Sequence, residues 1–164
     1  MMTHLRRMTA GLVIGALSAM LGSASAQSPV APLTLAEALA LIEATETAAA
    51  AKDLLLSIAV VDGRGDPIAV VRLPGARLAT TDTAIGKAMV SAMTGRPSAA
   101  TIGQGQNALY QNLNDSTGGR LRFFQGAVPI LRDGFTVGAI GASGASAQDD
   151  EDAVMAALRA VGIR

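Results

Sequence analysis

The chain of 164 residues contains no cysteine and no tryptophan, and its one histidine is His4. Without cysteine it can form no disulfide and offers no thiolate to a metal ion or a substrate. His4 lies in an N-terminal stretch that we expect to be removed, and the remaining chain would then contain no imidazole. These absences exclude the serine–histidine–aspartate triad and the usual zinc sites.

The first residues have the pattern of a secretory signal. Arg6 and Arg7 precede an apolar run at 11–21, and the small residues at 24–26 suit a signal peptidase. The apolar run is shorter than the roughly 20 residues that a transmembrane helix needs. We therefore predict a signal peptide at 1–26, cleaved after Ala26, and a periplasmic or secreted protein that is not inserted in the membrane afterwards.

Length and charge limit what the mature chain can be. Removing 26 of the 164 residues would leave 138, which suits one domain. Of the 13 basic residues two would leave with the signal, so 11 would face 13 acidic residues, a formal net charge of −2. Such a chain is not expected to bind nucleic acid, because phosphate binding needs a basic surface. We expect a disordered linker at 27–32 and a single domain at 33–164.

The domain is expected to begin with a helix at Leu35–Lys52. Thr34 can cap this helix, and Glu37 three positions later completes a capping box. Its apolar residues recur at helical spacing. The expected apolar stripe consists of Leu35, Ala38, Leu39 and Ile42.

Two hairpins and three further helical stretches follow. The branched run at 54–61 and the run at 68–73 flank the turn "DGRGDP", which predicts a β-hairpin. Residues 127–144 predict a second hairpin that turns at Asp133–Gly134. Between the hairpins we expect a helix that ends at Met93 and is capped by Thr80, Thr81 or Asp82. Its small-residue face would consist of Ala84, Ala88, Ser91 and Ala92. A weaker helical piece is expected within 99–113. A closing helix follows the acidic run 149–152. The order predicts an α+β fold: one antiparallel sheet of about five strands with helices packed on it.

Gly138, Gly141 and Gly144 recur at every third residue of the second hairpin. This spacing differs from the G-x-G-x-x-G sequence of dinucleotide sites, and no parallel βαβ unit surrounds it. Glycine inside a strand also allows another backbone to approach closely. We therefore expect these glycines to admit a helix of the same subunit or a neighbouring chain.

Five short stretches together resemble one family. They are "VVDGRG" at 60–65, "RLPGA" at 72–76, "AIGKA" at 84–88, "VPILRDGFTVG" at 128–138 and "AIGASGASAQDD" at 139–150. In this order they are similar to the GlcG/HbpS-like family of haem-binding or haem-degrading proteins, which is related to a domain of PduO-type proteins. The structural residues of the matching motifs would be Asp62, Gly65, Gly138, Gly141, Ser143, Gly144 and Asp150.

The resemblance implies a homo-oligomer that binds a small ligand, with haem as the best known case in one branch. Our first hypothesis is an exported, non-catalytic binding module for a small anionic ligand or haem. The second is an enzyme acting on haem or a small carbonyl or organic-acid compound through Lys87. The third is a structural oligomer without a ligand.

Lys87 and Arg72 are the candidates for charge contacts with a ligand. Lys87 is one of two lysines and lies on a helix otherwise made of small residues. Its ammonium, like the guanidinium of Arg72, would suit a carboxylate. Alternatively, Lys87 extends to solvent or pairs with Asp62 or Asp82.

Iron ligands and aromatic contacts have few candidates. Haem iron is normally held by histidine, cysteine, methionine or tyrosine, so Tyr110 and the methionines remain. Tyr110 is thus a weak candidate for the iron ligand, and otherwise it anchors a loop. Met93 lies one helical turn from Met89, a spacing that core packing also explains. Phe123 and Phe124 cannot both face the core of an extended segment, so Phe124 is a candidate for covering a ligand or a subunit contact.

Overall fold

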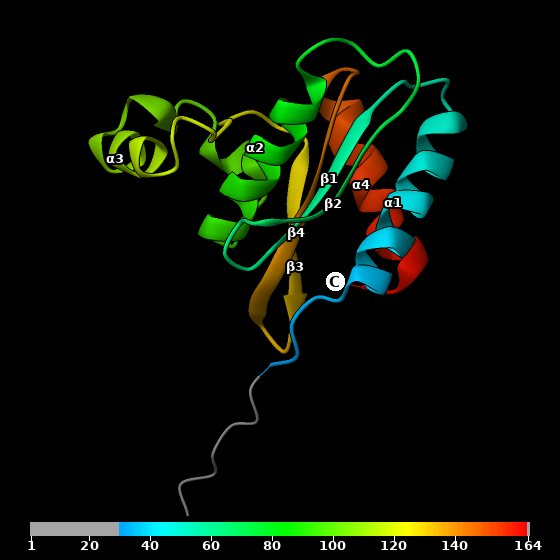
Figure 1. The fold of residues 1–164 in the computed structure, drawn as a ribbon, viewed down its shortest axis with the longest axis horizontal. Helices are drawn as coiled ribbons and strands as arrows, with labels where there is room; N and C mark the ends of the chain where they lie inside the picture. Colours follow the sequence, from blue (N-terminus) through cyan, green and yellow to red (C-terminus); the bar gives the residue numbers. More distant parts are fainter. Residues whose placement is uncertain (1–29, 164) are drawn as a thin grey trace, which may run out of the picture.

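The computed structural model describes residues 30–163 as four helices, four strands and two short 3-10 turns (Figure 1). In chain order these are α1 (Leu35–Ala50), β1 (Ser57–Asp62), β2 (Pro67–Arg72), α2 (Thr80–Thr94), the turns η1 (Ser98–Thr101) and η2 (Gln104–Gln106), α3 (Ala108–Ser116), β3 (Ala127–Arg132), β4 (Phe135–Ser143) and α4 (Ala147–Val161). The expected signal peptide at 1–26 lies outside the described residues.

The strands form one antiparallel sheet in the order β2-β1-β4-β3. Helix α2 covers one face of the sheet, and α1 and α4 pack side by side on the other (Figure 1). The predicted α+β fold is therefore confirmed, but the expected count of about five strands is wrong. The long segment after α3 does not add a strand, because Gly118, Gly119 and Gly126 take positive φ angles that a strand cannot accommodate.

Helix α1 begins as its sequence predicts. The Thr34 hydroxyl accepts from the Glu37 amide at 3.2 Å, and the Glu37 carboxylate accepts from the Thr34 amide at 2.8 Å, which completes the capping box. The Thr34 amide and the Thr34 hydroxyl both donate to the Glu37 carboxylate, and with Arg132 nearby they lower the pKa of the Glu37 carboxyl. Arg132 also donates to the carbonyls of Ala31 and Pro32, so the described part of the expected linker contacts the domain.

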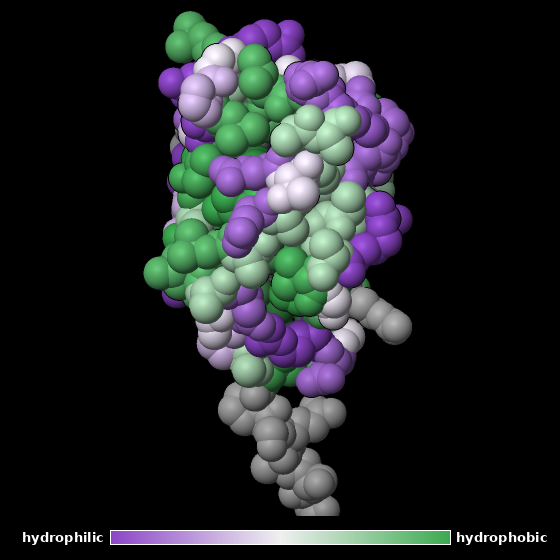
Figure 2. Space-filling model, turned by 90° about the vertical axis from the view of Figure 1, so that its right-hand side faces the viewer, coloured by the Kyte–Doolittle hydropathy of each residue, from purple (hydrophilic) through white to green (hydrophobic). Residues whose placement is uncertain are grey.

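The buried face of α1 differs in part from the expected stripe. Ala38 and Ile42 are buried, but Leu35 and Leu39 are exposed, and Leu41 faces the core instead. The helix packs against both the sheet and α4, so its buried face is set by two neighbours rather than by one. On the surface that α1 and α4 present, hydrophobic and hydrophilic residues are interspersed (Figure 2).

Large and small side chains are segregated on the two faces of the sheet. Ile58 and Val60 of β1 and Ile140 of β4 join the main core under α1 and α4. Toward α2 the cluster is made of smaller residues, including Ala88, Ala92 and Ala139. Because these side chains are small, the backbone of α2 lies close to the sheet.

Gly141 of β4 allows the close approach of a helix of the same subunit, as the sequence predicted. A Cβ on Gly141 would lie 2.7 Å from the carbonyl oxygen of Ala84 on α2. On Gly138 of β4 and on Gly144, just after β4, it would lie 2.4 Å and 2.3 Å from the backbone oxygens of Val61 in β1 and of Leu55 before β1, so these two glycines do not meet a helix. Their role in the described chain is therefore packing against backbone.

Both hairpin turns agree with their sequences, but the cap of α2 does not. Asp133 and Gly134 both take positive φ, at 52° and 81°, as a tight Asp-Gly turn requires. The expected cap at Thr80, Thr81 or Asp82 is wrong, because the N-cap is Ala79 and no side chain caps the helix. The hydroxyl of Thr80 instead donates to the carbonyl of Arg77, which removes it from a capping position.

A buried ion pair joins α2 to α4 at the end of β4. The Lys87 ammonium donates to a carboxylate oxygen of Asp150 at 2.8 Å and to the Ala142 carbonyl at 3.0 Å. The second Asp150 oxygen accepts from the Ala145 amide at 3.0 Å. The side chains of Lys87 and Asp150 are only 4% and 3% exposed. Gly126 makes room for the pair, because a Cβ there would lie 2.7 Å from the Lys87 nitrogen.

The pair predicts a specific pattern of stability. Lys87→Met leaves the Asp150 charge buried without its partner, so we expect the free energy of unfolding to fall by about 3–5 kcal/mol. The double variant Lys87→Met/Asp150→Asn removes both charges and keeps an acceptor for Ala145, so it should lose less. Urea denaturation measures both. Lys52→Met, which breaks an exposed pair with Asp149, is the control and should change little. A double variant less stable than Lys87→Met contradicts the account.

Candidate functional site

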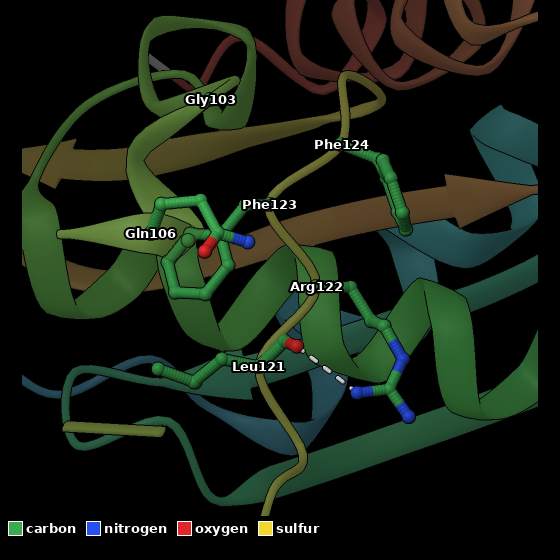
Figure 3. Close-up of a pocket in the computed structure, with 7 residues that line it drawn as sticks. Gly103, Gln106, Leu121, Arg122, Phe123 and Phe124 are labelled. Carbon is green, nitrogen blue, oxygen red and sulfur yellow. Dashed lines mark hydrogen bonds between the residues drawn. The ribbon is translucent and has the colours of Figure 1, made fainter. Parts of the chain in front are cut away.

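A hollow lined by aromatic rings lies where the chain returns from α3 to the sheet (Figure 3). Its volume is about 320 Å³. We call it the aromatic hollow, and it is lined by Gly103, Gly105, Gln106, Leu121, Arg122, Phe123 and Phe124. Concave sites of this size with apolar walls and a few polar groups are typical of small-molecule binding.

The two adjacent phenylalanines point in different directions, as the sequence predicted. The Phe123 ring lies toward Gln106, whereas the side chains of Arg122 and Phe124 lie on the other side of the segment (Figure 3). Phe123 packs against the cluster of Met89, Val90 and Leu121, and Phe124 is 58% exposed. Phe124 is therefore a free aromatic surface at the edge of the hollow.

Tyr110 lies beside this hollow rather than in it. It is half-buried on α3, and its ring meets the Phe123 ring edge to face, with the centroids 5.5 Å apart. Edge-to-face pairs of this kind are favourable and hold both rings in place. Tyr110 and Phe123 are therefore in contact, which the sequence alone did not predict.

Met93 packs behind the hollow. It is partly buried against the cluster of Met89, Val90 and Leu121 and does not line the aromatic hollow. Its position is that of a core residue, in keeping with the packing explanation of the Met89 and Met93 spacing.

A glycine in the middle of α2 positions the returning segment. The Arg122 amide donates to the Gly86 carbonyl at 3.2 Å. A Cβ on Gly86 would lie 2.3 Å from the Arg120 carbonyl and 2.5 Å from the Cγ atom of Arg122. Only glycine lets this segment lie so close on the helix. Sequence reasoning missed Gly86, although glycine in a helix interior is itself a signal, because it costs about 1 kcal/mol relative to alanine.

A second hollow adjoins the first through Arg122. Its volume is about 410 Å³, and we call it the arginine hollow. It is lined by Pro67, Asp82, Ile85, Gly118, Gly119, Arg120 and Arg122. Neither Arg120 nor Arg122 was singled out from the sequence, because nothing in the local pattern indicates which arginines of a loop come together.

Lys87 and Arg72 do not contact the aromatic hollow. Lys87 is held by Asp150 and Ala142, and its partner is neither Asp62 nor Asp82. Arg72 is exposed, donates to the Ala76 carbonyl at 3.0 Å and lines a separate hollow with Arg77. The two residues are therefore not brought together with the aromatic candidates.

The remaining motif residues have structural positions. The Asp62 carboxylate accepts from the amides of Arg64 and Asp66 and so closes the first hairpin. Gly65 in this turn has a φ of 91° and lies against Met89. Ser143 is the last residue of β4, opposite Ser57 of β1.

Across residues 30–163 no group of three or more histidine, aspartate or glutamate side chains is placed to hold a metal ion. In the same part of the chain no helix has the length and apolar character needed to cross a membrane.

Comparisons with known proteins identify the fold. The family described as "Haem degrading protein HbpS-like" matches residues 33–159. The corrinoid adenosyltransferase PduO of Salmonella typhimurium is 30% identical over 108 residues, which make up 65% of this chain but only 32% of PduO. This chain therefore spans less than half of that enzyme.

Solved structures agree with the family match. The crystal structure of a PduOC–haem complex has a TM-score of 0.73 at 24% identity and covers 82% of this chain and 98% of its own. The structure of HbpS has a TM-score of 0.71 at 26% identity, with 81% and 92% covered. Since the family match spans most of the domain and the motifs resemble the same family, the chain belongs to the HbpS-like family.

Proposed function

We propose that this protein binds haem or a closely related tetrapyrrole, without converting it, in the aromatic hollow. The observation that carries the proposal is that Phe123 and Phe124 line one concave surface, with the Tyr110 ring packed on Phe123 beside it. The family description and the haem complex of PduOC support the choice of ligand.

The residues at the hollow fit the chemistry of haem. Its flat apolar ring suits contact with the exposed Phe124 ring, which lies on the same side of the segment as Arg122 (Figure 3), and its carboxylates suit the Arg122 guanidinium. When bound, haem would supply an iron centre, and Tyr110, which lies beside the hollow, is the candidate that would offer it a phenol oxygen. Lys87 and Arg72, our first candidates for the charge contacts, lie elsewhere and are not part of this proposal.

The enzyme alternative through Lys87 finds no support in its surroundings. A lysine acts as a nucleophile when its amine is desolvated and neutral. The Lys87 ammonium donates to a carboxylate and a carbonyl and lines neither the aromatic nor the arginine hollow. Its position favours a structural role.

The binding proposal predicts the outcome of a hemin titration. Hemin should develop a shifted Soret band on addition of the protein, and Tyr110→Phe should alter that spectrum. Phe124→Ala should weaken binding roughly fivefold, because an aromatic contact contributes about 1 kcal/mol. Leu78→Ala, at a side chain 98% exposed on another loop, is the control. If the parent protein leaves the hemin spectrum unchanged, the structural oligomer is the better hypothesis. If the Soret band decays when ascorbate is added, the protein degrades haem, and the enzyme hypothesis is the better one.

We also propose that the protein self-associates through α3 and the turn before it. This part projects from α2 away from the sheet (Figure 1), and α3 buries none of its residues within the described chain. Ile102 and Leu109 are 58% and 70% exposed there. Large apolar side chains gathered on a projecting element are typical of a subunit contact.

Light scattering tests the self-association. The parent protein should be oligomeric at micromolar concentration, and Leu109→Lys should shift it toward the monomer. Leu78→Lys adds the same charge on an exposed leucine elsewhere and should leave the oligomer intact. A parent protein that is strictly monomeric contradicts the proposal.

Export remains a proposal from the sequence alone. We expect the mature protein to begin at Gln27 and to lie in the periplasm or outside the cell. Mass spectrometry of the protein purified from those fractions should find this N-terminus. A soluble cytoplasmic pool that retains residues 1–26 would show the expectation to be wrong.

A further inference from the structure

The arginine hollow carries more positive than negative charge. Arg120 and Arg122 line it, and Asp82 is the one acidic residue of its lining. Within residues 30–163 neither arginine forms a salt bridge, whereas Arg132 pairs with Glu37 and Arg64 with Asp66. Two guanidinium groups on one hollow without a carboxylate partner favour an anionic ligand.

Backbone contacts hold both guanidinium groups in position. Arg120 donates from Nε to the Thr117 carbonyl at 3.1 Å. Arg122 donates from Nη1 to the carbonyls of Gly119 and Leu121 at 2.8 and 3.0 Å. A guanidinium has five N–H donors, so each group keeps donors for a ligand. Because the side chains are already held, binding would cost little conformational entropy.

The stem of Arg122 is fixed as well. It lies over Gly86 of α2, where a Cβ would come within 2.5 Å of its Cγ atom. Arg122 lines both the aromatic hollow and the arginine hollow. A ligand with a flat apolar body in the aromatic hollow would therefore have the Arg122 guanidinium beside it and the arginine hollow next to it.

We infer that Arg120 and Arg122 form a carboxylate subsite that selects tetrapyrroles with free acid groups at one edge. The inference rests on the proposed haem function. The ring lies against the exposed Phe124, on the same side of the segment as Arg122 (Figure 3), and its carboxylates extend past Arg122 into the arginine hollow. The open space around Gly118 and Gly119, where a Cβ would meet nothing within 4 Å, leaves room for them.

The test compares hemin with hemin dimethyl ester, whose carboxylates are blocked. Arg120→Gln and Arg122→Gln should each raise the Kd for hemin roughly 5- to 20-fold, since a charge-assisted hydrogen bond at a partly exposed site is lost. The Kd for the ester should not change. Arg96→Gln is the matched control: it removes the same charge from an exposed arginine that lines neither hollow.

Three other results of the two titrations would contradict the inference. If the parent protein binds neither compound, the proposed function fails and the inference with it. If it binds hemin and both arginine variants match Arg96→Gln, the function stands and the subsite is wrong. If a variant weakens ester binding as much as hemin binding, the arginine acts by shaping the loop, and the carboxylate subsite is also wrong.

Discussion

The contact of α2 with backbone on both of its sides is the constraint on which the rest of the structure depends. Toward the sheet, Gly141 of β4 meets the Ala84 carbonyl at a distance that leaves no room for a Cβ. On another face, Gly86 of α2 receives the segment that carries Arg120 and Arg122. A helix placed so closely cannot shift without moving both the sheet and the candidate site, because packed interiors have little free volume.

The buried ion pair completes this arrangement. On the side of α2 that faces the sheet the buried residues Ala88 and Ala92 are small, so each contributes little buried apolar area. Lys87 adds a directional contact to Asp150 and Ala142, which fixes the position of α2 along β4. Because both charges had to leave water, such a pair adds less net stability than its attraction alone suggests, whereas losing one partner leaves a buried charge uncompensated.

Much of the fold was readable from the sequence because its signals are local. The Thr34 and Glu37 capping box, the Asp133–Gly134 turn and the small-residue face of α2 each follow from spacing and backbone chemistry. The partner of Lys87 was not readable, since Asp150 lies 63 positions away and four other aspartates share its chemistry within the second half of the chain. Only part of the candidate site could be predicted, because its contacts also join residues that are distant in the sequence. Phe124 and Tyr110 were noticed as isolated aromatics, but only the path of the chain over Gly86 joins Tyr110 to Phe123 and brings Arg122 beside them.

The central claim is that the ligand lies on the returning segment over α2, and NMR tests it most directly. Ferric hemin is paramagnetic and broadens the signals of nearby amides, so its addition to ¹⁵N-labelled protein maps the site without a mutation. The account predicts that the amides of Gly105, Phe123 and Phe124 lose intensity first, while those of Arg72 and Glu46, which line other hollows, persist. Broadening centred on Arg72 or Glu46, or none at all, would contradict it.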